Sequence, residues 1–425
     1  MGVEPSLHRQ RAATSYRIWV KYVALATVAS VPFSTSATSI LVPVLAAMAI
    51  PLLAWSDLRA EIARPRSGLP ILLAFLGIAG LLWSDADWHD RINGLGPFMR
   101  FLLLPIFAVY FQRSGTGVNA LYTFLIACGV ILVISLTAFW FPQVTFWRPG
   151  YPVVPFKDAT TQSLECGLCA FGLVSCLSEA RPFTLTARSA FASLLALLFV
   201  ADIIYVATSR TELVAIVVTL PLLAIRRWGG RGIAGSIICL VLISVAAWYS
   251  SANIRERVRH GFWEYQRYES LDQGTSIGAR LEFWRRSIVI MSQAPLAGHG
   301  TGSIEHAFAA TAIPGQEWIG TSHQTGTHVA RTMVTPNPHN QTFAVGIQLG
   351  LIGIAVLYAM WAAQYWNFRG PRIVDTLGLV VIIQFVIGSI FYSYLFDFTE
   401  AWIFVLALAI LYGMQTDASA GRTFP

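Results

Sequence analysis

The stretch that organises this chain is Pro336-Asn337-Pro338-His339-Asn340-Gln341, which separates a long polar segment from an apolar segment carrying Gly346, Gly350 and Gly353. A residue before proline is held out of the helical conformation, so the X-Pro steps end any helix on the polar side. The apolar segment that follows is long enough to form a membrane helix. The sequence therefore places the imidazole of His339 at the mouth of a membrane bundle, where it can serve as a base at the boundary between lipid and water.

Composition agrees with a membrane location. Only 12% of the 425 residues are charged and 55% are hydrophobic, whereas a soluble chain has about a quarter charged residues. A spanning helix needs about 20 apolar residues. Windows of that length predict an all-α polytopic membrane protein of about twelve transmembrane helices. These helices start near Tyr16, Ala37, Leu69, Gly96, Gly117, Thr161, Arg188, Thr211, Gly232, Asn340, Arg372 and Glu400.

The predicted helices divide the chain into three parts. Residues 1–250 hold the first nine helices, residues 251–338 form one large loop subdomain, and residues 339–425 hold the last three helices. The N-terminal stretch lacks a small-residue cleavage site and is interpreted as a cytoplasmic tail. All five cysteines fall inside predicted helices, where Cys166 and Cys169 are interpreted as packing residues.

The distribution of basic residues predicts the orientation. With the N-terminus inside, the short outer segments hold only Arg91, Arg100, Arg148, Lys157 and Arg210. The positive-inside rule then places both termini in the cytoplasm and the large loop outside. The cytoplasmic segments hold sixteen basic residues: Arg9, Arg11, Arg17, Lys21, Arg59, Arg64, Arg66, Arg113, Arg181, Arg188, Arg226, Arg227, Arg231, Arg369, Arg372 and Arg422.

Three arginines do not serve this orientation. Arg210 lies in a tight outer turn, where it either pairs with Glu212 or has a function, and Arg100 lies one turn inside the outer end of the fourth helix. Arg280 lies in the loop segment Gly278-Ala279-Arg280-Leu281-Glu282-Phe283-Trp284. Arginine at membrane depth costs about 2.5–3.5 kcal/mol on insertion scales, and guanidinium groups bind phosphate oxygens in pairs. Arginines at one depth near a histidine predict a lipid-diphosphate site.

Several motifs resemble those of a known family. They are the Arg280 segment above, then Ala294-Pro295-Leu296-Ala297-Gly298-His299-Gly300-Thr301-Gly302, then His339-Asn340, then Gly350-Leu351-Ile352-Gly353. In this order they resemble the O-antigen ligase and polymerase superfamily of bacterial inner-membrane glycosyltransferases, and O-antigen ligase most of all. The resemblance departs from the commoner glycine-aliphatic-glycine pattern at His299, which is interpreted as a turn residue.

The resemblance implies a GT-C-like fold and an O-antigen ligase. Such an enzyme transfers glycan from undecaprenyl diphosphate to a sugar hydroxyl of the lipid A core, inverts the anomeric carbon, and uses no metal or other cofactor. The family's essential histidine falls on His339, and its arginines fall on Arg210 and Arg280. We expect His339 to act as general base and the two arginines to hold the diphosphate, with Arg100 as a further diphosphate ligand.

Three further residues are candidates for supporting this site. Asn340 follows the histidine directly. Asp397 lies between the last two helices and can orient His339 or a substrate hydroxyl, or cap the last helix. Glu165 is an intramembrane acid and a candidate partner for one of the arginines.

The sequence also leaves alternatives open. The outer turn Ser84-Asp85-Ala86-Asp87-Trp88-His89-Asp90 holds an Asp-x-Asp step that could bind a divalent metal, although a simple polar turn is favoured. A polymerase or a protein O-oligosaccharyltransferase would share the same donor motifs. A secondary transporter or flippase is a more distant alternative, because the halves show no repeat. The sequence lacks nucleic-acid motifs, and its net charge of +7 is explained by the cytoplasmic loops.

Overall fold

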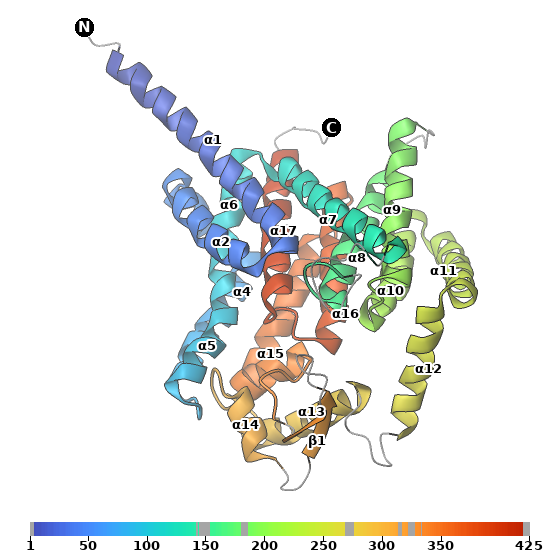
Figure 1. Cartoon of the computed structure of the whole chain (residues 1–425). Helices are drawn as coiled ribbons and strands as arrows, with labels where there is room; N and C mark the ends of the chain where they lie inside the picture. The colour runs from blue at the N-terminus through green and yellow to red at the C-terminus, as the bar shows by residue number, and fades with distance from the viewer. Residues whose placement is uncertain are drawn as a thin grey trace.

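The computed structural model describes residues 4–141, 143, 154–179, 186–267, 276–312, 317–321, 328–332 and 334–419. These residues form a bundle of long helices with a smaller layer of elements at one end (Figure 1). The first half contains α1 (Glu4–Phe33), α2 (Thr35–Ala49), η1 (Ile50–Leu52), α3 (Trp55–Ile62), α4 (Pro65–Ala79), η2 (Gly80–Leu82), α5 (Trp88–Met99), η3 (Arg100–Leu103), α6 (Leu104–Ser114), α7 (Gly117–Trp140) and α8 (Ala159–Glu179). The second half contains α9 (Ala187–Tyr205), α10 (Arg210–Trp228), α11 (Gly230–Ser250), α12 (Ala252–Arg267), α13 (Ser276–Gln293), α14 (Ile304–Ala310), β1 (Glu317–Thr321), β2 (His328–Thr332), α15 (Gln341–Asn367), α16 (Ile373–Phe391) and α17 (Phe398–Ser419).

The predicted class, an all-α polytopic membrane protein, is confirmed. Within the described ranges nine helical segments are long and apolar enough to cross a membrane, the predicted number being about twelve. The other three predicted spans fall on α1, α8 and α10, which are long helices with more polar sequences. Charges explain the difference for α10, which begins with Arg210 and Glu212 and ends with Arg226 and Arg227.

The smaller layer lies between α11 and α15 in the sequence. It contains α12, α13, α14 and an antiparallel sheet in which β1 pairs with β2, with Glu317 opposite Thr332. Figure 1 shows this layer at the end of the bundle opposite to the start of α1 and the end of α17.

Helix α17 forms the centre of the bundle. Of its membrane-length window, 89% is buried, and it packs against α6 and α16. Small residues allow the close approach: a methyl group on Gly413 of α17 would lie 2.7 Å from the backbone of Phe111 in α6. Helices in membranes associate through such small residues because lipid provides no hydrophobic driving force between them.

A buried polar network ties the helices together at the end away from the small layer. Arg66 of α4 donates hydrogen bonds to Glu61 at 2.7 and 2.8 Å and to Gln415 of α17 at 2.9 Å. Gln364 of α15 donates to the Arg66 carbonyl at 2.7 Å. Removing one partner of a buried ion pair is costly, so this network fixes α4, α15 and α17 relative to one another.

Helix α15 is broken at Gly350, whose φ of 60° and ψ of −157° are not helical. The break frees backbone groups, and the segment 295–300 binds them. His299 N donates to Ile347 O at 2.8 Å and Gly300 N donates to Gln348 O at 2.9 Å, while Leu351 N donates to Pro295 O at 2.8 Å. Backbone polar groups at membrane depth must be satisfied by the protein itself, so the break and the segment 295–300 depend on each other.

Glycine is required where this segment crosses the bundle. Gly298, Gly300 and Gly302 all have positive φ, a conformation that other residues adopt at a cost. A methyl group on Gly300 would lie 2.3 Å from Ser84 Cα, and one on Gly302 would lie 2.2 Å from Asp90 O. The glycine pattern in the sequence therefore reflects a close approach between the 298–302 segment and the turn after α4.

We expect Gly350→Ala to destabilise the protein by about 2–4 kcal/mol. The methyl group would lie 2.3 Å from Leu296 O, and a non-glycine residue at positive φ costs about 1–2 kcal/mol before any clash. The measurement is thermal unfolding of the purified protein in detergent. The control is Gly129→Ala, because a methyl group there has nothing within 4 Å; equal melting temperatures for both variants would contradict the interpretation.

Candidate active site

His339 is held in a strained backbone conformation just before α15. Its φ of 52° makes it the one non-glycine residue with positive φ in the part of the chain that the structure describes. The His339 backbone N donates to Asn337 Oδ1 at 2.9 Å. Asn340 then caps α15, because its Oδ1 accepts from Phe343 N at 3.1 Å and its Nδ2 donates to Ile390 O at 2.8 Å. Such local strain persists only where the surrounding structure imposes it, and it is concentrated at functional sites.

Aromatic rings enclose the imidazole. The ring of Phe283 stacks on it at a centroid distance of 6.2 Å, and the ring of Tyr392 meets it edge to face at 5.9 Å. Its Nδ1 atom is buried without a hydrogen-bond partner among the described residues. Burial, followed by the nearby Arg280 guanidinium, lowers the pKa of His339 to about 4. The side chain is therefore neutral at physiological pH, and it is a weaker base than an ordinary histidine.

Arg280 reaches the same place from α13. Its Cζ atom lies 4.6 Å from the centroid of the Tyr392 ring, a cation–π distance. Tyr392 therefore contacts both His339 and Arg280, and its hydroxyl accepts a hydrogen bond from Thr160 Oγ1 of α8 at 3.1 Å. The structure brings His339 and Arg280 together around one aromatic ring.

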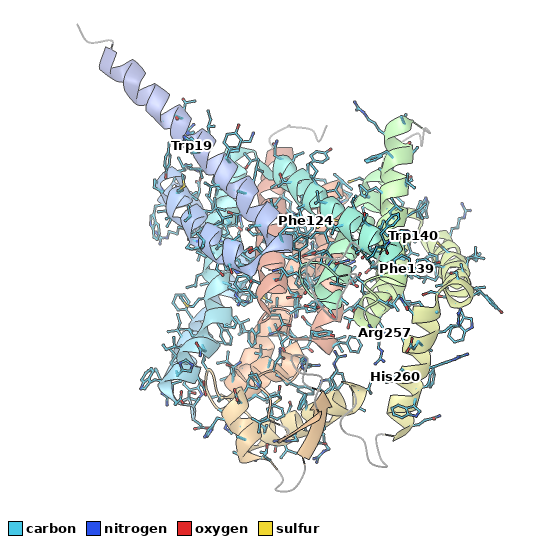
Figure 2. The ribbon with its side chains drawn as sticks, in the orientation of Figure 1. Trp19, Phe124, Phe139, Trp140, Arg257 and His260 are labelled. Atoms are coloured by element: carbon cyan, nitrogen blue, oxygen red, sulfur yellow. The ribbon has the colours of Figure 1, made fainter. Side chains whose placement is uncertain are left out.

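Arg210 lies at the start of α10, against α12. Its Nη2 donates to Arg257 O at 3.5 Å, and Figure 2 shows Arg257 and His260 on α12 at the side of the bundle. A methyl group on Gly261 would lie 3.8 Å from both Arg210 Cζ and Ile277 Cδ1. Ile277 stands three residues before Arg280 on α13, which is the spacing of one helical face. Arg210 thus lies near the first turn of the helix that carries Arg280.

Arg100 is used differently from the expectation. It donates from Nη1 to Phe396 O at 3.1 Å and to Asp397 O at 3.0 Å, and its Cζ lies 5.2 Å from the Phe398 ring centroid. These bonds hold the connection between α16 and α17. The geometry makes Arg100 a residue that positions this connection, and its expected place beside the diphosphate stays a prediction.

Asp397 acts on the histidine segment through Asn337. Its Oδ1 accepts from Asn337 Nδ2 at 3.1 Å, and Asn337 Oδ1 in turn accepts from Ser393 Oγ at 2.8 Å and from His339 N. Burial, followed by the charge of Glu400, raises the pKa of Asp397 to about 8. Of its expected roles, the orientation of the His339 segment is the one for which bonds can be traced. They run from Asp397 through the Asn337 side chain to the backbone N of His339.

Glu165 does not meet an arginine. The charged groups that act on it are Glu400, Lys157 and Asp158, and its Oε1 has no hydrogen-bond partner within the described ranges. It is 2% exposed in α8. Glu212 is also buried, close to Gly167 of α8. Among the described residues Glu165 therefore has no arginine partner, and the prediction that it pairs with one is wrong.

The acidic outer turn has structural uses. Asp87 Oδ1 caps α5 by accepting from Asp90 N at 2.9 Å, and Asp85 Oδ2 lies 2.9 Å from His299 Nδ1. Among the described residues no group of three or more His, Cys, Asp or Glu side chains is arranged to hold a metal ion. The contact with Asp85 also gives His299 a role beyond a turn, because it ties the 298–302 segment to this outer turn.

The sequence analysis did not identify two residues that contact the His339 segment, Tyr392 and Asn337. Tyr392 stands in Phe391-Tyr392-Ser393-Tyr394 at the end of an apolar helix, a position typical of the interfacial aromatic belt. Asn337 belongs to the histidine motif, but its neighbours Pro336 and Pro338 suggested only a turn. Repeated aromatic residues beside an expected histidine site were the signal that could have identified Tyr392.

Fold and site together define a multi-pass membrane protein with a histidine and arginines at one mouth of its bundle. Residues 194–358 match the O-antigen ligase family model. This segment contains Arg210, Arg280, His339, Asn340 and the 298–302 crossing. Over this segment, which is less than half of the chain, the protein is similar to O-antigen ligases. No curated protein matches the chain.

The strain at His339 gives a test on stability. We expect His339→Asn to keep or raise the free energy of unfolding, because asparagine tolerates positive φ better than other residues. His339→Val should lower it by about 1–2 kcal/mol, because a β-branched residue is poorly accommodated there. Thermal unfolding in detergent provides the comparison, and a valine variant as stable as the asparagine variant would mean that the conformation carries no strain.

Proposed function

We propose that the protein is an O-antigen ligase, which transfers glycan from undecaprenyl diphosphate to a sugar hydroxyl of the lipid A core. The observation that carries this proposal is the shared contact of His339 and Arg280 with Tyr392, within the segment that matches the O-antigen ligase family. A neutral imidazole next to a guanidinium group is what glycan transfer from a diphosphate requires: a proton acceptor for the hydroxyl and a cation for the leaving group.

The donor side consists of arginines from two elements. Arg280 comes from α13. Arg210 comes from the start of α10 and lies near the first turn of α13. A guanidinium fork forms paired, charge-assisted bonds with phosphate oxygens. In the proposed reaction these two residues bind the diphosphate and stabilise the charge that develops on it as the bond to the sugar breaks. Arg100 stabilises the site indirectly, because it donates hydrogen bonds to carbonyls of the α16–α17 connection.

The acceptor hydroxyl attacks the anomeric carbon and gives its proton to His339. One carbon–oxygen bond forms while the bond to the diphosphate breaks, so a single displacement inverts the anomeric configuration. The low pKa of His339 keeps the ring unprotonated before the donor arrives. The negative charge of a bound diphosphate would then offset Arg280 and raise the pKa of the imidazole, which makes it a better base when the donor is in place. The mechanism needs no metal, because guanidinium groups stabilise the leaving group.

The membrane placement follows from the charge asymmetry. Basic residues concentrate in the segments assigned to the cytoplasm, and the positive-inside rule then orients the protein. The start of α1 and the end of α17 lie on the same side of the bundle, opposite to the layer that contains α13 and α14 (Figure 1). The proposal is a bacterial inner-membrane protein with cytoplasmic termini and a periplasmic active site.

Transfer should depend on His339. Wild-type protein in liposomes, given undecaprenyl-diphosphate-linked glycan and rough lipopolysaccharide, should produce a ladder of extended acceptor on a gel. His339→Asn should lower the rate by about 10²–10⁴ fold, because general-base catalysis contributes that much, while the protein stays folded. Unchanged transfer by this variant would exclude His339 as the base. Extension of the carrier-linked glycan in place of the lipopolysaccharide would identify a polymerase, and labelling of a protein acceptor would identify a protein transferase.

The pH dependence should follow the pKa of His339. We expect kcat/KM for the donor to stay level from about pH 8 down to about pH 5 and to fall at lower pH, because the histidine is protonated only near a pKa of about 4. Arg280→Gln should move this midpoint upward, though not to the ordinary histidine value, because burial is the larger cause of the low pKa. Arg59→Gln removes an exposed charge at the other end of the bundle and should leave the midpoint unchanged. A wild-type midpoint near 6.5 would contradict this account.

A further inference from the structure

A cavity adjoins the histidine segment 336–339. Its volume is about 320 Å³, and its walls come from α5, the start of α14, residues 336–338 and the α16–α17 connection. Asn337 and Pro338 form one wall, and His339 follows them directly in the chain. Arg280 and Tyr392 are not among the lining residues. The cavity therefore touches the histidine segment without including the cluster proposed to hold the diphosphate.

The polar side chains of this cavity suit hydroxyl groups. Asp90 and Asn93 come from α5, Glu305 from α14, and Asn337 and Asp397 from the histidine side. Carboxylates accept hydrogen bonds from hydroxyls, and amides both donate and accept. Phe396 adds an apolar wall, held in place by the ring of Phe98 at a centroid distance of 4.9 Å. Carboxylates and amides suit the hydroxyl groups of a sugar, and an aromatic ring suits its apolar C–H face.

The charge of the cavity argues against a phosphate. Among the described residues that line it, none is a lysine or an arginine, whereas Asp90 and Glu305 are acids. An anionic group would meet repulsion there. The cations of the site stand with Tyr392 and α13 instead. Donor and acceptor chemistry are thus separated: one side is suited to a diphosphate and the other to a neutral sugar.

One wall of the cavity is bonded to the backbone of His339. Asn337 lines the cavity and binds the backbone N of His339 through Oδ1 at 2.9 Å, while its Nδ2 binds Asp397 at 3.1 Å. Ser393, another lining residue, donates to the same Asn337 oxygen at 2.8 Å. Because these bonds occupy the Asn337 amide, an incoming molecule would be bound by Glu305, Asp90 and the Oδ1 atom of Asn93, whose Nδ2 lies 3.0 Å from His89 Nε2.

We propose that this cavity is the acceptor subsite, which binds a neutral sugar residue and presents one of its hydroxyls to His339. This assignment rests on the proposed function. A volume of about 320 Å³ lies at the small end of ligand pockets and suits about one or two sugar rings. Specificity for the acceptor is then set by α5 and α14, outside the arginine cluster that all donors would share.

Kinetics with separate acceptor and donor titrations test the subsite. In full-length protein in liposomes, Glu305→Gln and Asn93→Ala should each raise the KM for rough lipopolysaccharide by about tenfold, the effect of one lost hydrogen bond to a sugar hydroxyl. The KM for undecaprenyl-diphosphate-linked glycan should not change. His306→Gln is the matched control, because His306 is exposed on α14 next to Glu305 and does not line the cavity. Normal transfer by wild type with an unchanged acceptor KM in both variants would overturn the subsite and leave the proposed function intact.

A binding measurement keeps the subsite testable apart from transfer. The probe is a lipid-free, dephosphorylated core oligosaccharide, observed by saturation-transfer NMR with the full-length protein in detergent. Binding to wild type that weakens in Glu305→Gln but not in His306→Gln supports the subsite, even if wild type transfers glycan to no acceptor and the proposed ligase function fails. Absence of oligosaccharide binding to wild type, or equal binding by all three proteins, rejects the subsite.

Discussion

The pairing between the broken helix α15 and the segment 295–300 is the interaction on which the outer half of the molecule depends. Helix α15 gives up its own backbone bonds around Gly350, and His299, Gly300 and Pro295 replace them. Exposed backbone groups are not tolerated in lipid, so neither partner is stable without the other. The same pairing fixes where α15 begins, and therefore where His339 lies relative to α13, α14 and the α16–α17 connection.

The site on this frame combines strain, burial and charge. His339 has a left-handed backbone and a ring nitrogen without a partner among the described residues, and an unsatisfied buried polar atom costs about 1–3 kcal/mol. These features do not help the protein to fold. They agree with a residue retained for chemistry, whose ring is kept neutral by its surroundings and kept in place by Asn337 and Tyr392. Arg100 holds the connection that carries Tyr392, and Asp397 binds the side chain of Asn337.

The sequence predicted much of the fold because apolar windows and proline steps act locally. Every expected helix start falls within or next to a helix, and the smaller layer lies between α11 and α15 in the sequence. Contacts between residues far apart in the chain could not be predicted in the same way. Arg100 was expected beside the diphosphate because of its depth, yet its bonds go to the Phe396 and Asp397 carbonyls almost three hundred residues away. Glu165 was expected to meet an arginine, but the charged groups that act on it are Glu400, Lys157 and Asp158. Residue type and depth predict which groups are costly to bury; only packing decides which groups become neighbours.

The break at Gly350 has a mechanical meaning for a protein that works at a membrane surface. Beyond the break, the inner part of α15 is tied to α4 and α17 through Gln364 and Arg66, whereas the part that follows His339 is tied to the 298–302 segment. Membrane helices change their tilt when the hydrocarbon layer becomes thicker or thinner. Because the bend at Gly350 separates the two attachments, a change in tilt would act first on the part of α15 that carries Gln364. The part that follows His339 keeps its own bonds to the 298–302 segment.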